Sequence, residues 1–108
     1  MAKYTLIASR DPLESREGEK YCLLAGDLRR EGNEVTLFLV QNAVFGARKG
    51  AATGAYAKLS GAGVAVVADS FSLRERGIGK ERLAAGIAVA DLDVVIDHMS
   101  EGRKVLWN

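Results

Sequence analysis

The sequence predicts a single α/β domain in which a mainly parallel, five-stranded sheet lies between two layers of helices. Two short runs, residues 35–40 and 64–68, contain only apolar or β-branched side chains, which is typical of strands buried on both faces. Strand-like runs alternate with helical patterns, and this alternation favours right-handed crossovers between parallel strands. A chain of 108 residues buries roughly 65% of its unfolded surface as one domain. We therefore expect residues 1–108 to form one three-layer α/β/α unit.

The first third of the chain predicts a strand followed by a long helix. Residues 3–9 are rich in β-forming side chains. Asp11 is followed by Pro12 and then by Glu14, which predicts a helix start with a capping box. Four apolar residues then recur at helical spacing: Tyr21, Leu24, Ala25 and Leu28. A Gly-Asn pair at residues 32–33 ends the pattern.

The rest of the chain predicts four further strands and several short helices. The segment after residues 35–40 is too rich in glycine for one continuous helix, so we expect short helices near residues 42–48 and 53–60. After the strand at 64–68 we expect short helices at 72–76 and 80–85, a strand at 86–90, a helix capped by Asp91 and a last strand at 105–107. The apolar stripe of that last helix consists of Leu92, Val95, Ile96 and Met99. Trp107 is expected either to cover the core or to anchor a subunit interface.

Polar side chains follow the buried run at residues 64–68. Ligands of open α/β sheets bind just beyond the carboxyl ends of the strands, which makes this junction a candidate site for a small molecule or an anion. The candidate ligand-binding residues are Asp69, Ser70, Phe71, Ser72 and Arg74, with Gln41 and Asn42 at the end of the neighbouring strand. Two alternatives remain open. Asp69 or Ser70 caps the helix that follows, or Asp69 acts as the general base of an enzyme, with a raised carboxyl pKa in a dry cleft.

The same junction resembles a known family. A buried strand, a short polar loop and a helix ending in Arg76-Gly77-Ile78 are similar to the DsrE/DsrF-like family, small α/β proteins that include sulfur-relay subunits. The resemblance extends to residues 34–50 and 86–107. In the carrier subunits of that family, a cysteine at the end of the central strand accepts a persulfide sulfur.

When the resemblance is anchored on Arg76-Gly77-Ile78, the cysteine position holds Asp69, with Ser70 next to it. Neither a carboxylate nor a hydroxyl can form a persulfide. The resemblance therefore implies a non-thiol subunit or partner in sulfur transfer. It also implies a dimer, trimer or hexamer, often with this loop beside a subunit interface, and closed homo-oligomers are a general expectation.

The only cysteine and the only histidine both lie on predicted helices. Cys22 is one step off the apolar stripe of the first helix, and we expect a partly buried structural side chain. The alternative is a relocated sulfur carrier, although nothing near it in the sequence clearly lowers the pKa of its thiol. His98 is off the stripe of the last helix, and we expect a solvated side chain rather than a catalytic base. A hydrolase built from Ser70 or Ser72 with His98 and Asp69 lacks the G-x-S-x-G elbow.

The glycine-rich middle segment invites comparison with phosphate-binding loops. Gly46, Gly50 and Gly54 surround Arg48 and Lys49, and backbone amides with two cations near a helix start suit a phosphate. The spacing G-x-x-x-x-G-K-[ST] is absent, however, and the glycines at 61–63 precede their strand where a dinucleotide fingerprint follows one. We expect residues 50–54 to act as a mobile lid or a subunit contact instead.

Charge and composition limit the classes of partner. Fifteen Lys and Arg against fourteen Asp and Glu give a net charge of +1, which provides no long-range field to attract nucleic acid or an anionic membrane. No apolar run approaches the ~20 residues that a transmembrane helix needs, and the start of the chain is too polar for a signal peptide. One cysteine allows neither an internal disulfide nor a Cys-rich zinc site. We expect a cytoplasmic protein without cofactor or metal, whose partners are copies of itself or a sulfur-relay protein.

Overall fold

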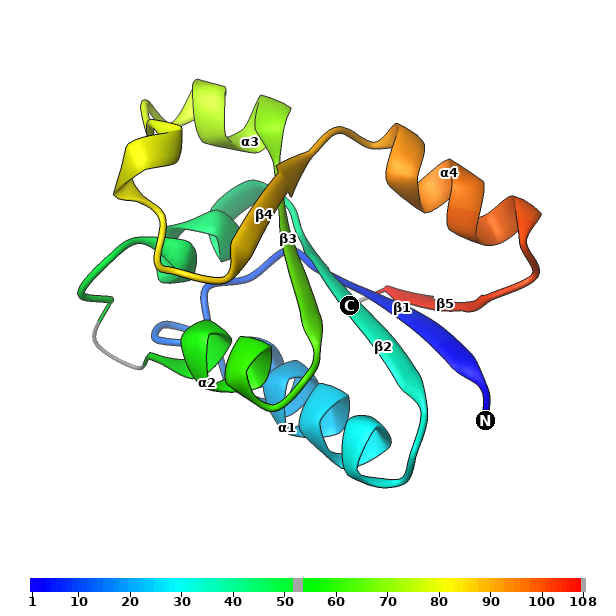
Figure 1. The fold of residues 1–108 in the computed structure, drawn as a ribbon. Helices are drawn as coiled ribbons and strands as arrows, with labels where there is room; N and C mark the ends of the chain where they lie inside the picture. The colour runs from blue at the N-terminus through cyan, green and yellow to red at the C-terminus, as the bar shows by residue number, and fades with distance from the viewer. Residues whose placement is uncertain (52–53, 108) are drawn as a thin grey trace.

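A computed structural model, which describes residues 1–51 and 54–107, confirms the α/β domain. All strands are parallel in one sheet of order β4-β3-β2-β1-β5, so β5 is an edge strand (Figure 1). The strands are β1 (Lys3–Ala8), β2 (Glu34–Leu39), β3 (Ala65–Asp69), β4 (Ile87–Ala90) and β5 (Lys104–Trp107). Ala68 of β3 pairs with Leu39 of β2, which brings the carboxyl ends of these two central strands to the same level.

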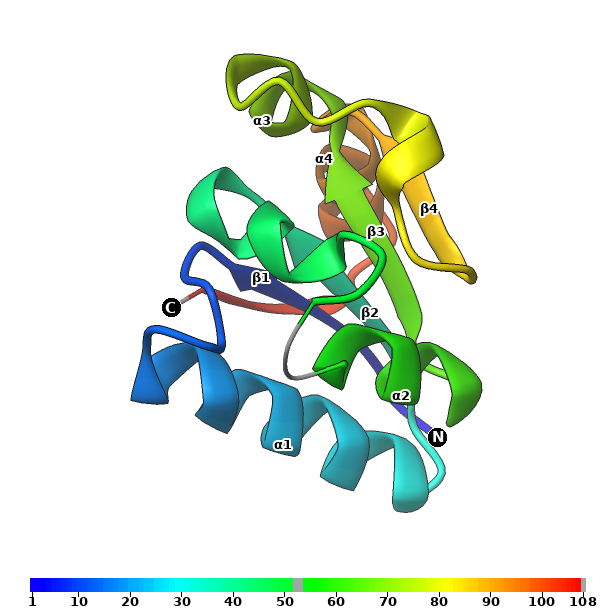
Figure 2. The same ribbon diagram turned by 90° about the vertical axis from the view of Figure 1, so that its left-hand side faces the viewer.

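Helices cover the two faces of the sheet unequally. Figure 2 shows α1 (Arg16–Arg30) and α2 (Ala55–Gly61) on one side of the sheet and α4 (Asp93–Ser100) on the other. The first face contributes most of the core, including Leu6, Leu37 and Tyr56. The second face buries a smaller cluster under α4: Ile7, Phe38, Val40 and Val95. The predicted three layers are confirmed, with one thick and one thin helical layer.

Short helices close the carboxyl end of the sheet. The 3-10 helix η1 (Gln41–Ala47) follows β2, α3 (Ser70–Glu75) follows β3 directly, and the 3-10 helix η2 (Lys80–Arg82) precedes β4. The helices predicted near 42–48 and 80–85 are therefore 3-10 turns, and α3 begins two residues before the predicted start. The helix predicted at 53–60 is α2; residues 52 and 53, part of the expected lid at 50–54, lie outside the described residues.

The predicted start of the first helix is wrong by several residues. Asp11 forms a local turn instead, because its Oδ1 accepts a hydrogen bond from the Leu13 amide at 3.0 Å. The helix α1 begins only at Arg16, with Ser15 as N-cap. The turn packs tightly against the helix, since a Cβ added to Gly18 would lie 2.8 Å from the Arg10 carbonyl oxygen. The Asp-Pro-x-Glu pattern thus directs a turn that abuts the helix.

The predicted inward stripe of the last helix is also mostly wrong. Val95 is buried, but Leu92, Ile96 and Met99 are 48%, 55% and 60% exposed. Asp91 does not cap this helix in the predicted way, because Leu92 is the N-cap residue and the Asp91 carboxylate accepts from the Asp93 amide. Trp107 is 65% exposed, which rules out its role as a cover of this chain's own core.

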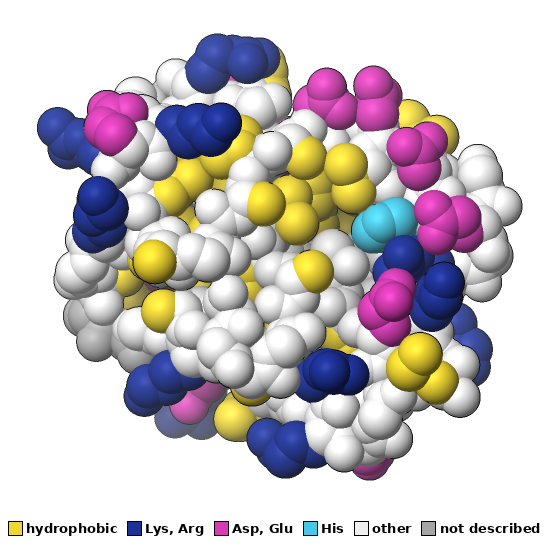
Figure 3. Space-filling model, viewed as in Figure 1, with side chains coloured by type: hydrophobic (Ala, Val, Ile, Leu, Met, Phe, Trp, Pro, Cys, Tyr) yellow, Lys and Arg dark blue, Asp and Glu magenta, His cyan; other side chains and the backbone are white. Residues whose placement is uncertain are grey.

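Hydrophobic side chains remain at the surface on the side of the thin layer. Figure 3 shows a group of them between β4 and α4. In β3 and β4, Val67 is half-buried and Ala88 is exposed, so α4 leaves this side of the sheet partly open.

No helix in the described part of the chain is long and apolar enough to cross a membrane.

Candidate functional site

Asp69 ends the central strand β3 and caps the helix that follows. Its Oδ2 atom accepts hydrogen bonds from the Ser72 amide at 3.0 Å and from the Ser72 hydroxyl at 2.7 Å. Asp69 and Ser72 are only 6% and 3% exposed. The capping alternative is therefore confirmed for Asp69. The carboxylate oxygen in these bonds is committed to the backbone and side chain of its own helix.

The Ser72 hydroxyl also holds the end of the neighbouring strand. Its Oγ atom accepts a hydrogen bond from the Gln41 amide at 2.8 Å. Gln41 has a φ of 51° and is the only described non-glycine residue with a positive φ, so the chain turns sharply where it leaves β2. A continuous relay from the Asp69 carboxylate through Ser72 to Gln41 thus ties the carboxyl ends of β2 and β3 together.

A second link joins Asn42 to Arg76, a residue that the sequence did not single out as a contact. The Asn42 Oδ1 atom accepts from Nε and Nη2 of Arg76 at 3.1 and 3.0 Å, and Nη1 donates to the Ser72 carbonyl at 3.3 Å. The Arg76 guanidinium also lies 5.9 Å from the centre of the Phe45 ring. Its place in the Arg-Gly-Ile motif was the available signal for this role.

The remaining candidates project from the outer side of α3. Phe71 is 59% exposed, Arg74 is exposed and Ser70 is half-buried. Four of the predicted site residues are thus tied together by hydrogen bonds (Asp69, Ser72, Gln41 and Asn42), and of these Gln41 and Asn42 are also exposed. The other three (Ser70, Phe71 and Arg74) lie outside this hydrogen-bonded set. Ligand binding by these residues stays a prediction.

A small cavity of about 220 Å³ opens at the carboxyl end of the sheet, beyond β1. Only Asn42 among the predicted residues lines it; the others are Ser9, Arg10, Asp11, Glu14 and Ser15. These residues follow β1, and their position just after a strand was the signal that could have found them. Among residues 1–51 and 54–107, no group of three or more His, Cys, Asp or Glu side chains could hold a metal ion.

The sequence profile of the DsrE/DsrF-like family matches residues 2–107. This chain belongs to the DsrE/DsrF-like family. Solved structures with the same fold include the ychN protein from E. coli, with a TM-score of 0.90, 23% identity and full coverage of both chains. Protein MTH1491 of unknown function from Methanobacterium thermoautotrophicum gives a TM-score of 0.81 at 19% identity, again over both full chains.

A third solved structure extends the comparison within this fold. Protein BT1422 of unknown function from Bacteroides thetaiotaomicron has a TM-score of 0.80 and 15% identity, over 98% of this chain and 94% of the other. No curated protein matches. The likenesses to solved structures establish the fold of this DsrE/DsrF-like protein.

The single thiol of this DsrE/DsrF-like chain lies inside helix α1. Cys22 is 9% exposed and belongs to the main core cluster. Burial, and secondly the negative charge of Glu19, raise the pKa of this thiol to about 11. This burial and the raised pKa of the thiol support the structural interpretation of Cys22.

The hydroxyl of Tyr56, which is almost fully buried, has no hydrogen-bond partner among the described residues.

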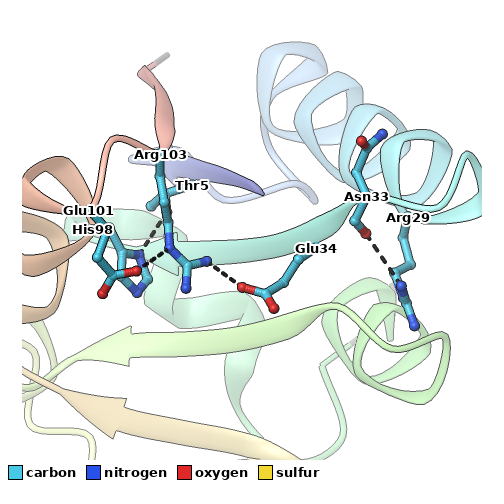
Figure 4. A network of polar contacts seen from close by, with 7 residues as sticks. All are labelled: Thr5, Arg29, Asn33, Glu34, His98, Glu101 and Arg103. Carbon is cyan, nitrogen blue, oxygen red and sulfur yellow. Dashed lines mark hydrogen bonds and ion pairs between the residues drawn. The ribbon is translucent and has the colours of Figure 1, made fainter. Parts of the chain in front are cut away.

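His98 belongs to a polar cluster that joins α4 to the sheet and is half-buried, so the expected solvated position is only partly correct. Figure 4 shows its ring beside Thr5 of β1, with Nδ1 2.7 Å from the Thr5 hydroxyl. Burial, and then the charge of Arg103, lower the pKa of the imidazole. Arg103 in turn forms ion pairs with Glu34 at 2.9 Å and Glu101 at 3.1 Å. His98 is bonded to a buried threonine of the sheet, which gives the hydrolase alternative no support.

Proposed function

We propose that the protein acts in sulfur transfer as a non-thiol subunit or partner of a cysteine-bearing DsrE/DsrF-like protein, and not as a persulfide carrier. The observation that carries this proposal is the chemistry at the end of β3. There, where family carriers have a cysteine, Asp69 is a buried helix cap bonded to Ser72. A carboxylate in that role has no sulfur to exchange.

The buried state of Cys22 supports the same proposal. Persulfide formation requires a thiolate that can attack a sulfur donor. With a pKa of about 11, only about one Cys22 thiol in ten thousand is ionised at pH 7. Only 9% of Cys22 is exposed, at the wall of two surface pockets, which leaves little of the thiol for a protein donor to reach. If the chain cannot carry sulfur itself, its role in sulfur transfer is to bind a protein that does.

The intact mass of the protein after exposure to a small persulfide donor tests the carrier question. We expect no one-sulfur gain in the wild type, and the Cys22→Ser variant is the matched control. A gain that disappears in Cys22→Ser contradicts the proposal, because it makes Cys22 a carrier. The second arm measures binding to a family member that has a cysteine at the end of its central strand, in its persulfide form. Absence of binding at micromolar concentrations contradicts the partner role.

We also propose that the protein is a homo-oligomer that associates through the outer side of α4. Leu92, Ile96 and Met99 recur about one turn apart on this helix and are all about half exposed. Figure 3 shows a further group of hydrophobic side chains between β4 and α4. A second copy packed there would remove these side chains from water, each worth about 1–2 kcal/mol.

The solution mass measured by light scattering tests this association. We expect a dimer, trimer or hexamer for the wild type and a shift toward monomer for Ile96→Asp. Lys58→Asp, on the exposed side of α2, is the control and is expected to keep the wild-type mass. A monomeric wild type at high micromolar concentration is the contrary result.

A cytoplasmic location fits these roles, and the lone unpaired thiol of the chain is consistent with it.

A further inference from the structure

A second cavity lies away from the end of β3. It has a volume of about 620 Å³, within the usual range of small-molecule sites. Its lining consists of Leu13, Arg48, Lys49, Gly50, Ala51, Glu81 and Arg82. Neither Asp69 nor Cys22 belongs to it. The two halves of this cationic pocket come from the segment after η1 and from η2.

Backbone hydrogen bonds hold these two segments together. Arg48 and Leu83 form an antiparallel bridge. The Lys49 amide donates to the Arg82 carbonyl at 2.7 Å, and the Ala84 amide donates to the Ala47 carbonyl at 2.9 Å. Because Ala47 and Leu83 are buried, the backbone beneath the cationic side chains is anchored in the core. In Figure 2, the yellow turn at η2 and the green turn after η1 lie on the same side of the molecule.

The charges in this pocket are unbalanced. Three cations and one carboxylate line it, although the whole chain has a net charge of only +1. Within residues 1–51 and 54–107, none of Arg48, Lys49 and Arg82 forms an ion pair. The Glu81 carboxylate lies beside Gly79 and offsets only one of the three positive charges. The pocket therefore presents an excess of two positive charges on neighbouring side chains.

Arg48 is oriented in a way that leaves its outer edge available. Its Nε atom donates to the Phe45 carbonyl at 2.8 Å, and its guanidinium lies 5.2 Å from the centre of the Phe45 ring. These contacts fix the plane of the guanidinium while the terminal nitrogens keep their donor hydrogens. A held guanidinium of this kind suits bidentate contact with a phosphate. Gly50 adds a turn with open space where a Cβ would be, so a ligand can approach the backbone.

We infer that this pocket binds the diphosphate group of a small molecule. A diphosphate has enough negative charge to engage all three cations, and two phosphoryl groups match cations placed on two adjacent segments. Leu13 and Ala51 line the same pocket and give an apolar surface for an organic group attached to the phosphates. The site does not depend on the sulfur-transfer proposal, because the residues that carry the two are different.

Isothermal titration calorimetry of the full chain with inorganic pyrophosphate tests the inference. We expect pyrophosphate to bind more tightly than inorganic phosphate, with an affinity that falls as salt rises. Arg82→Gln and Lys49→Gln are each expected to weaken pyrophosphate binding about tenfold, as the loss of one charge-assisted contact does. Glu81→Gln, which removes the only carboxylate of the lining, is expected to strengthen binding severalfold.

The control is Lys20→Gln, an exposed cation on α1 outside the lining, which is expected to leave binding unchanged. Because all these side chains are exposed, we expect the substitutions to leave the fold intact, and the thermal midpoint of each variant checks this. Failure of pyrophosphate to bind at millimolar concentration overturns the inference, and so does equal weakening by Lys20→Gln and Arg82→Gln. Tighter binding of ADP than of pyrophosphate, with the difference lost in Leu13→Asn, supports an organic diphosphate; equal binding of the two overturns the assigned role of Leu13.

Discussion

Replacement of Asp69 by alanine tests the hydrogen-bonded relay at the ends of β2 and β3. The substitution removes a helix N-cap, which costs about 1 kcal/mol. It also leaves the Ser72 hydroxyl without the acceptor that lies 2.7 Å away. Since Ser72 is 3% exposed, water cannot replace that acceptor, and an unsatisfied buried group costs about 1–3 kcal/mol. We expect Asp69→Ala to lower the free energy of unfolding by about 2–4 kcal/mol.

The amide variant separates the role of the hydrogen bonds from that of the charge. Asp69→Asn keeps a side-chain oxygen that can accept from the Ser72 amide and hydroxyl. We expect it to lose less than about 1 kcal/mol, because asparagine is nearly as good an N-cap as aspartate. Ser72→Ala breaks the same relay from its centre, where Oγ also accepts from the Gln41 amide.

Urea unfolding of these variants at one fixed protein concentration is the assay, because association would otherwise change the apparent stability. We expect the double variant Asp69→Ala/Ser72→Ala to lose clearly less than the sum of the two single losses, since both remove the same bond. A loss below 1 kcal/mol for Asp69→Ala, or strict additivity of the two single variants, would refute the relay. Equal losses in Asp69→Ala and Asp69→Asn would instead assign the stabilisation to the charge.

Three further predictions concern the thiol, the imidazole and a helical glycine. The alkylation rate of native Cys22 with iodoacetamide is expected to rise about tenfold per pH unit up to a pKa of about 11; a plateau near pH 9 would contradict the burial effect. The pKa of His98 is lowered below 6.5 in the folded state. The neutral imidazole therefore stabilises the fold at neutral pH, and this stabilisation is lost as the pH drops through 6.5 toward the folded pKa. Unfolding measured from pH 7.5 to 5 should show a weaker decline in His98→Gln. Gly18→Ala should destabilise the chain by about 1–3 kcal/mol, since the added Cβ would meet the Arg10 carbonyl at 2.8 Å, whereas Gly61→Ala meets nothing within 4 Å and should be neutral or stabilising in thermal unfolding.

The positions of the strands were well predicted because a continuous apolar run is a local pattern. Residues 35–40 and 64–68 are such runs, which indicate strands buried on both faces. This burial is complete for residues 35–40, but Ala65 is exposed and Val67 is half-buried, because the thin helical layer covers β3 only in part. The helix ends were harder. Asp11, Pro12 and Glu14 satisfy a capping pattern, but the same residue types also favour a turn. Contact between that turn and Gly18 decides the outcome, and local sequence does not record this contact.

The last helix shows a different limit of sequence reasoning. Its apolar residues recur at helical spacing, yet Ile96 and Met99 are 55% and 60% exposed. Periodicity identifies the apolar face of a helix but not what packs against that face, which can be the sheet of the same chain or a second chain. At the candidate site, the position of Asp69 at the end of β3 was predictable. Its commitment to Ser72, and the approach of Arg76 to Asn42, depend on how two loops meet in space.

The order of the strands along the sheet also bears on how the chain folds. From β1 to β4 the chain adds each strand beside the previous one, but β5 returns to pair with β1 at the opposite edge. An intermediate in which α4 and β5 have not docked therefore has β1 as an unpaired edge strand. In that intermediate Ile7, Phe38 and Val40, which α4 helps to bury, face the solvent beside the open edge. Such an intermediate is open to wrong strand pairing, and docking of α4 and β5 closes the exposed edge.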